Sequence, residues 1–325
     1  MIFYPIRSKL LLTGIELKVF NYMSDPVSAE EVAQTIDAHP RNMSLFLDGL
    51  AAIDLVQKKN GLYQNSPMVQ AFLVEGSQTY VGQVLAFMAS SDSLLDNLKT
   101  LVKEGPPPKP ETPPFSEEML AQGAAMMANT ERAGDAQLAV KIVSKLPEFF
   151  SSQKMLDLGG GPGLIGMAIV AAHPDMKGVI FDLPLVVRVA ETFIREYRME
   201  DRVEVLGGDF NRDPIGEKYD VVFTSNSLQF AHEIDSVVKK IYDALNPGGV
   251  FVSIFGFGQT QEGTKPENLV LGLLSMVLTG QEAGVEQGYI VDSMLRVGFR
   301  SVHSRILSTA WGSMELDIGR KYFFA

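Results

Sequence analysis

The stretch Met155-Leu-Asp-Leu-Gly-Gly-Gly-Pro-Gly163, followed by Leu164-Ile-Gly-Met-Ala-Ile-Val-Ala-Ala-His173, decides the fold of this chain. An apolar strand with one acid leads into a glycine-rich turn, and an apolar helix follows. Glycine lacks Cβ, so a ligand can lie against the backbone, and Gly159, Gly161 and Gly163 can adopt positive φ. The first N–H groups of the helix have no partner within it and can face a ligand. The pattern predicts a ligand-binding turn.

Two further strands that end in acids strengthen this interpretation. Gly178-Val-Ile-Phe-Asp182 places a carboxylate where dinucleotide-binding folds bind ribose hydroxyls. A third strand ends in Gly207-Gly-Asp-Phe210, whose acid and aromatic ring suit an adenine base. Ligands of doubly wound sheets bind at the carboxyl ends of the strands. We therefore expect the glycine turn, Asp182 and Asp209 at one edge of a sheet.

Alternating strand and helix patterns run from Lys154 towards the end of the chain. Strands are predicted at 154–158, 178–182, 203–206, 219–224 and 249–255, with two more near 300–307 and 321–324. Asn246-Pro-Gly-Gly249 predicts a turn into the fifth strand. The expected fold class is therefore α/β, with a doubly wound, Rossmann-like domain over residues 151–325.

The first 104 residues have a different, mostly helical pattern. It predicts a helix over Leu10–Met23, a second helix that begins with a capping box of Ser28 and Glu31, and a hairpin around Asn60-Gly61. Helices followed by a hairpin are typical of a winged helix. Residues 1–80 hold six Lys/Arg against eight Asp/Glu, which favours dimerisation or another interaction over DNA binding.

A connection joins these two regions over residues 105–150. Helix is expected to continue over 66–104, and the segment 105–114 then has six prolines in ten residues, which predicts a stiff, extended connection. Helix is expected again over 115–146. A cluster of methionines on this helix, including Met126 and Met127, suits either a core or the wall of an apolar pocket.

Composition narrows the possible partners. A net charge of −11 opposes binding to nucleic acid or to an anionic membrane surface. The absence of cysteine excludes disulfides, thiolate metal sites and cysteine nucleophiles, and we predict no metal site. The start of the chain lacks a signal-peptide pattern, and the longest apolar run, Leu269–Leu278, is too short to span a bilayer. We expect a cytoplasmic protein.

Taken in order, the motifs resemble those of class I S-adenosylmethionine-dependent methyltransferases, and more closely the small-molecule O-methyltransferases of the caffeate, hydroxyindole and polyketide-tailoring type. The matching motifs are Asp157-Leu-Gly-Gly-Gly-Pro-Gly163, Phe181-Asp-Leu-Pro184, Gly208-Asp-Phe210 and Asn246-Pro-Gly-Gly249. Residues 1–104 resemble the winged-helix dimerisation domain of that family. The resemblance implies S-adenosylmethionine as cofactor, a small-molecule acceptor and a homodimer formed through the N-terminal domain.

The resemblance also implies roles for individual residues at the cofactor site. The glycine turn would carry the methionine portion of the cofactor, Asp182 the ribose diol, and Asp209 with Phe210 the base. The full set of predicted cofactor-binding residues is Asp157, Gly159, Gly161, Gly163, Asp182, Leu183, Asp209, Phe210 and Ser225. A nicotinamide dehydrogenase, the competing interpretation of the glycine turn, has no role for Asp209 and Phe210.

The sequence departs from the family at the catalytic base. The family's histidine falls near Ser227 or Leu228, and Gln229 and Phe255 occupy the positions of its two supporting acids. The usual base machinery is therefore expected to be absent. His232 and Glu282 are the candidate catalytic residues that remain.

An acceptor pocket is expected beside the cofactor. The residues predicted to line it are Met88, Phe115, Met126, Met127, Asn226, Leu228, Phe255 and Trp311. The predicted activity is methyl transfer, most often to oxygen, on a small aromatic or apolar acceptor, mainly by proximity. The alternatives are an acceptor that is already nucleophilic at S, N or C, a non-methylating protein that keeps the cofactor as a structural element, and a ligand-sensing winged-helix regulator.

Overall fold

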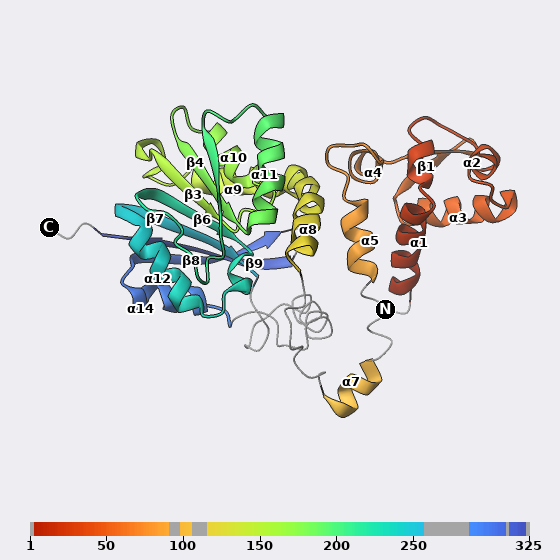
Figure 1. Cartoon of the computed structure of the whole chain (residues 1–325). Helices are drawn as coiled ribbons and strands as arrows, with labels where there is room; N and C mark the ends of the chain where they lie inside the picture. Colours follow the sequence, from red (N-terminus) through yellow and green to blue (C-terminus); the bar gives the residue numbers. More distant parts are fainter. Residues whose placement is uncertain (1–2, 91–97, 106–115, 257–285, 310–311, 323–325) are drawn as a thin grey trace. The chain divides into compact units, whose positions relative to one another are not determined.

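The computed structural model describes residues 3–90, 98–105, 116–256, 286–309 and 312–322 of the 325-residue chain. The chain forms two compact units, Met1–Ser93 and Leu94–Ala325 (Figure 1). Within the described ranges, none of the helices has the length and apolar character that a membrane crossing needs.

The N-terminal unit consists of helices and one short hairpin. Its elements are α1 (Tyr4–Glu16), the 3-10 turn η1 (Val19–Tyr22), α2 (Ala29–Thr35), α3 (Pro40–Ala52), β1 (Val56–Lys59), β2 (Leu62–Asn65), α4 (Pro67–Phe72) and α5 (Gly82–Ser90). The predicted capping box is confirmed, because Ser28 Oγ accepts the Glu31 N–H at 3.2 Å. The predicted hairpin is confirmed too, since Asn60 and Gly61 have φ of 52° and 80°.

Two predicted helices of this region have different bounds in the structure. α1 begins earlier than predicted, at Tyr4, because Pro5 suits the first turn of a helix, and η1 replaces its expected last turn. The helix predicted over 66–104 is broken between α4 and α5; α7 (Leu98–Glu104) follows residues 91–97, which lie outside the described ranges. α4 ends at Phe72 with Leu73 as its C-cap, and Gly76, with φ of 86°, lies in the turn that follows.

A seven-stranded sheet forms the centre of the C-terminal unit (Figure 1). Its strands in spatial order are β5 (Val203–Gly207), β4 (Lys177–Asp182), β3 (Lys154–Leu158), β6 (Tyr219–Ser225), β7 (Leu245–Phe255), β9 (Gly312–Arg320) and β8 (Arg300–Thr309). The first five are parallel, and β9 is antiparallel to both of its neighbours. The predicted α/β class is confirmed.

Two further corrections concern strands. The strand predicted at 321–324 was placed too late, because β9 ends at Arg320 and residues 321–322 are not strand; residues 323–324 lie outside the described ranges. Polar side chains at 313, 315 and 317 alternate with apolar ones in β9, so this strand lacks the apolar run that marks the others. The fifth strand also begins earlier than predicted, at Leu245, and Asn246-Pro-Gly-Gly249 lies inside it, where its pairing with β6 is irregular.

Helices cover both faces of the sheet (Figure 1). One face packs against α9 (Ala136–Val143), α10 (Leu164–Ala171) and α11 (Pro184–Glu196), and the other against α12 (Ile234–Ala244) and α14 (Tyr289–Val297). Short 3-10 turns precede β3 and α12, namely η3 (Phe149–Ser151) and η4 (Leu228–Phe230). This arrangement leaves the carboxyl ends of the parallel strands as one edge.

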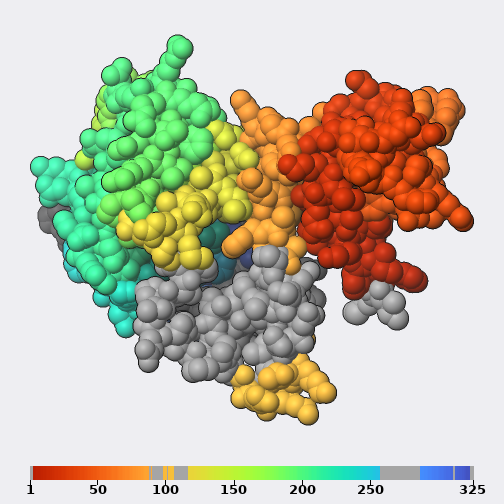
Figure 2. Space-filling view, turned by 45° about the vertical axis from the view of Figure 1, so that its right-hand side comes forward, coloured from red at the N-terminus to blue at the C-terminus, as the bar shows by residue number. Residues whose placement is uncertain are grey.

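A π-helical turn interrupts the helix predicted over 115–146. It is η2 (Glu131–Asp135), and it separates α8 (Glu117–Thr130) from α9. α8 packs along α11, as the adjoining yellow and green surfaces in Figure 2 show. The turn contacts α10 as well, so it brings residues upstream of the sheet next to the glycine turn.

Candidate functional site

The glycine turn that follows β3 folds back onto β4. The N–H groups of Gly159 and Gly160 donate to the carbonyl of Phe181 at 2.7 and 3.1 Å. The φ angles of Gly159, Gly161 and Gly163 are 70°, 54° and 80°, so the predicted positive-φ turn is confirmed.

The three positive-φ glycines have different neighbours. A Cβ on Gly159 would lie 2.3 Å from Ser227 Cβ, and a Cβ on Gly163 would lie 2.4 Å from Ile180 Cδ1. Among the residues that the structure describes, a Cβ on Gly161 would meet no atom within 4 Å. Gly159 and Gly163 are therefore required for packing, whereas Gly161 faces open space that a ligand can use.

Two buried acids bind the first turn of α10 beneath this loop. Asp157 Oδ2 accepts the Gly166 N–H at 3.0 Å, and Glu131 Oε2, from η2, accepts the Ile165 N–H at 3.1 Å. Burial raises the pKa of Asp157 to about 7, and burial together with the charge of Asp157 raises the pKa of Glu131. The expectation that these N–H groups face a ligand was wrong for Ile165 and Gly166, because carboxyl groups of the protein already bind them.

A third acid, Asp182, ends β4 and reaches the same loop. Its Oδ2 accepts the Gly161 N–H and its Oδ1 accepts the Leu183 N–H, both at 2.8 Å. Burial raises the pKa of Asp182, and the charge of Glu117 adds to this effect. Glu117 lies in the first turn of α8, and its Oε1 accepts the N–H of Leu185 at 2.6 Å. Asp182 therefore fixes the position of Gly161 from the side on which β4 ends.

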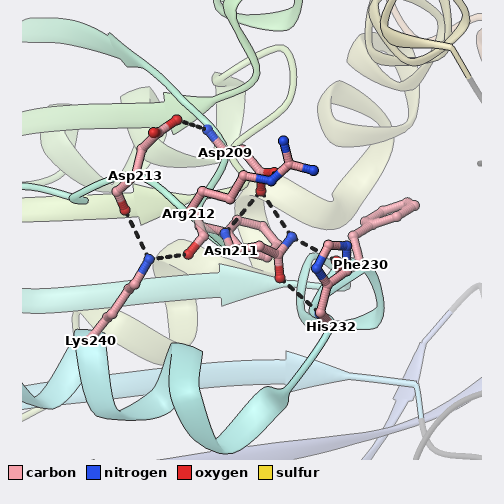
Figure 3. Close-up of polar contacts among 8 residues, drawn as sticks. Asp209, Asn211, Arg212, Asp213, Phe230, His232 and Lys240 are labelled. Atoms are coloured by element: carbon pink, nitrogen blue, oxygen red, sulfur yellow. Dashed lines mark hydrogen bonds and ion pairs between the residues drawn. The ribbon is translucent and has the colours of Figure 1, made fainter.

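Asp209 follows β5 and belongs to a network that joins two loops (Figure 3). Its Oδ1 accepts hydrogen bonds from the backbone N–H and the side-chain amide of Asn211, each at 2.9 Å. The same amide donates to the carbonyl of Phe230 at 3.1 Å, and its oxygen accepts the His232 N–H at 2.8 Å. Asn211 thereby ties the loop after β5 to the loop after β6. Phe210 is buried in the core that packs against α12.

The loop after β6 contacts the glycine turn directly. Ser227 Oγ donates to the carbonyl of Leu158 at 2.7 Å. Asn226, with φ of 52°, accepts the Gly256 N–H on its Oδ1 at 3.0 Å. Ser225 is half-buried at the end of β6. This edge is therefore held by hydrogen bonds to the ends of β3 and β7.

The other predicted site residues are distributed unevenly. Leu228 and Phe255 are buried in the apolar core, Met126 and Met127 are half-buried on α8, and the side chain of His232 is exposed. Leu183 directly precedes α11. Phe115, Glu282 and Trp311, with the side chain of Met88 and the proline-rich segment 106–114, lie outside the described residues.

Family models match both parts of the chain. Residues 113–291 match the O-methyltransferase domain, which is more than half of the 325 residues, and residues 1–75 match the O-methyltransferase dimerisation domain. The chain belongs to the O-methyltransferase family. The resemblance noted from the sequence is confirmed, and this protein is an S-adenosylmethionine-dependent methyltransferase.

Named relatives support the same assignment. The N,N-dimethyltransferase OxyT of Streptomyces rimosus is 30% identical over 257 residues, which cover 76% of this chain and 74% of the relative. The tetracenomycin polyketide synthesis 8-O-methyl transferase TcmO of Streptomyces glaucescens is 26% identical over 99% of this chain and 94% of the relative. The structure of human N-acetylserotonin methyltransferase with its cofactor S-adenosylmethionine has the same fold, with a TM-score of 0.79 at 21% identity over 97% and 94% of the two chains.

The residues of the loop fit the cofactor of this methyltransferase family. Gly161 leaves open space above the backbone, and four carboxyl groups lie around the loop. None of the ion pairs found within the described ranges includes any of these carboxyl groups, which belong to Glu117, Glu131, Asp157 and Asp182. This excess of acidic over basic side chains suits a cofactor whose sulfonium carries a positive charge.

The sequence alone did not identify several residues of this site. Glu131 lies 34 residues before its partner Ile165, and Ser227 lies 69 residues after Leu158. Neither residue belongs to a sequence motif. Ser227 could have been predicted from its position, because the family's histidine falls at or beside it. No feature of the sequence marks Glu131 as part of the site.

Proposed function

We propose that this protein methylates a hydroxyl group of a small aromatic or polyketide-like acceptor, and that positioning supplies most of the rate. The observation that carries the proposal is the chemistry of the edge formed by β6 and β7. Where the family places its base and the supporting acid of β7, this chain has Ser227, Leu228 and Phe255. Leu228 and Phe255 are buried apolar residues, and the Ser227 hydroxyl donates to a backbone carbonyl. None of the three can take up a proton.

The chain's own residues are suited to holding the two reactants in place. The cofactor supplies an electrophilic methyl group on a sulfonium. Gly161 gives access to the loop backbone, and Asp182 holds that loop by accepting the Gly161 N–H. Asn211 holds the loops after β5 and β6 together. Alignment of two reactants can lower the activation barrier by about 7–11 kcal/mol. An acceptor that ionises on its own, such as an acidic phenol, then requires no protein base.

His232 is the histidine nearest in sequence to this edge, and it gives the decisive test. A general base contributes about a hundred- to ten-thousand-fold to the rate. His232→Gln keeps a polar side chain of similar size and leaves the backbone N–H that bonds to Asn211. We expect this variant to change kcat less than about threefold, because a proximity mechanism does not use the imidazole.

The pH dependence of the rate completes the test. With a series of phenols, kcat/KM should rise with the ionised fraction of each phenol. The midpoint of its pH profile should follow the pKa of the phenol, both in the native chain and in His232→Gln. A midpoint that stays fixed across the series and disappears in His232→Gln would refute catalysis by positioning. It would make His232 the general base.

A second candidate, N-methylation, is favoured by one comparison. The relative OxyT, 30% identical, is named an N,N-dimethyltransferase. An amine acceptor also requires no protein base when it reaches the site unprotonated. Radiolabelled cofactor with matched panels of phenols, thiols and amines distinguishes the candidates by where the label goes. Cofactor binding without label transfer to any panel would favour a protein that keeps the cofactor as a structural element.

We propose that the functional unit is a homodimer formed through residues 1–104. The match to the dimerisation domain supports this, as do the exposed apolar side chains of Phe3, Tyr4 and Ile6 at the start of the chain. Sedimentation velocity should give a dimer for the native chain, and Ile6→Asp should shift it towards monomer. A native chain that is monomeric at about 10 µM, about ten thousand times a nanomolar Kd, would contradict the proposal.

A further inference from the structure

Glu131 is a buried acid that lies outside the motifs of the α/β sheet. It begins the π-helical turn η2, is 8% exposed, and binds the Ile165 N–H. The next amide of α10, that of Gly166, binds Asp157, which is 3% exposed. Because the two amides belong to adjacent residues, both carboxyl groups lie at the first turn of α10, and the charge of Asp157 acts on Glu131.

We propose that Glu131 is a positioning residue that shares one proton with Asp157 in the free protein, and that binding of the cationic cofactor releases this proton to solvent. The inference deepens the proposed function and rests on its cofactor. The step is balanced: a carboxylic acid becomes a carboxylate, and the buffer takes up the proton.

The charges around this pair favour a shared proton. From neighbouring elements, Asp182 of β4 and Asp135 of η2 itself add negative charge. Arg132 follows Glu131 but points to α11, where it lies 3.4 Å from Glu196 and over the ring of Phe193. The described part of the chain shows no ion pair to Glu131 or Asp157.

The hydrogen bonds of the pair do not compensate for this repulsion. Each acid receives a backbone N–H from the first turn of α10, which favours ionisation. Two carboxylates close together in a dry environment nevertheless titrate as a pair and retain a proton more strongly than either would alone. Burial raises the pKa of both groups, in agreement with this geometry.

A ligand that binds at Gly161 would lie close to this pair of acids. A Cβ on Gly160 would lie only 2.9 Å from Asp157 Oδ2, so this carboxyl group is directly beneath the loop backbone. A positive charge on the other side of the loop favours the ionised form of the pair. S-adenosylhomocysteine has no sulfonium charge. The pair should therefore distinguish the two compounds by charge.

Proton release upon binding is measurable by calorimetric titration. S-adenosylmethionine and S-adenosylhomocysteine are titrated near pH 7 into the full chain in two buffers with different ionisation enthalpies, which gives the number of protons exchanged. We expect S-adenosylmethionine to release up to about one proton and S-adenosylhomocysteine clearly less.

Two variants localise the effect. Glu131→Gln keeps the shape and an oxygen for the Ile165 N–H, so it should fold, but it leaves Asp157 without a partner to share a proton. We expect proton release to fall clearly below that of the native chain, because only the proton of Asp157 remains to be released, and we expect the preference for S-adenosylmethionine over S-adenosylhomocysteine to fall by about tenfold. Glu118→Gln is the matched control, since Glu118 is exposed on α8, and should behave like the native chain. Should Glu131→Gln fail to fold, Asp157→Asn makes the same test.

The outcomes separate the inference from the proposed function. S-adenosylmethionine binding without proton release, or with the same release in Glu131→Gln, overturns the inference and leaves the methyltransferase intact. Failure of the native chain to bind either compound overturns both.

Discussion

Replacement of Asp317 by asparagine should remove a large part of the pH dependence of folding. Asp317 lies on β9 and is 0% exposed, and neither of its carboxylate oxygens has a hydrogen bond of normal geometry to the described residues. The hydroxyl of its cross-strand neighbour Ser253 on β7 is unpaired as well. Burial raises the pKa of Asp317 to about 7; the nearby Ser304 hydroxyl opposes this rise and the charge of Glu315 adds to it.

The sign and size of the effect follow from this shift. The carboxyl group has a pKa of 3.8 in its ordinary state, so the unfolded chain loses this proton at lower pH than the folded chain. The free energy of unfolding therefore falls as pH rises above 3.8, and the fall levels off above about pH 7. A difference of about 3 pKa units corresponds to about 4 kcal/mol, of which about 2.5 kcal/mol is lost between about pH 5 and pH 8.

Urea unfolding near pH 5 and pH 8 measures this quantity. The asparagine side chain of Asp317→Asn does not titrate. The free energy of unfolding of this variant should therefore fall by about 2.5 kcal/mol less than that of the native chain between the two pH values. Asp243→Asn on α12, where the side chain is 59% exposed, is the matched control and should keep the native pH dependence. If Asp317→Asn loses as much stability as the native chain, the carboxyl group does not have a raised pKa in the folded state.

Three further substitutions test the glycine loop and its neighbour. Gly161→Ala should cost only about 1 kcal/mol of stability, from its positive φ, yet weaken S-adenosylmethionine binding at least about tenfold in calorimetric titration; native affinity would show that the open space is not used. Gly159→Ala should lower the free energy of unfolding by about 2–4 kcal/mol in urea, because its Cβ meets Ser227, and Ser227→Gly in the same chain should restore part of this loss. If the urea midpoint of Gly159→Ala equals that of the native chain, the added Cβ does not clash with Ser227. Asn211→Ala removes the side-chain donor to Asp209, keeps the backbone one, and should weaken cofactor binding about tenfold by the same titration, with the fold retained; a native Kd would mean that Asp209 does not need the side chain of Asn211.

The sequence by itself predicted the parts of this protein that depend on neighbouring residues. The five parallel strands and the positive φ of Gly159, Gly161 and Gly163 follow from short apolar runs and a local turn. Asp182 was expected at the strand end where the structure has it. Strand β9 was placed wrongly, because its polar residues face a buried layer that only packing of β7 and β8 creates.

Only the tertiary structure decided which side chains meet. Leu228 and Phe255, expected to line the acceptor pocket, are buried in the core, and their apolar nature is compatible with both places. Glu131 reaches the glycine loop because a π-helical turn directs it there, across 34 residues of sequence. Local periodicity determines which segments are helix or strand, whereas burial and the pairing of charges depend on segments that become neighbours when the chain folds.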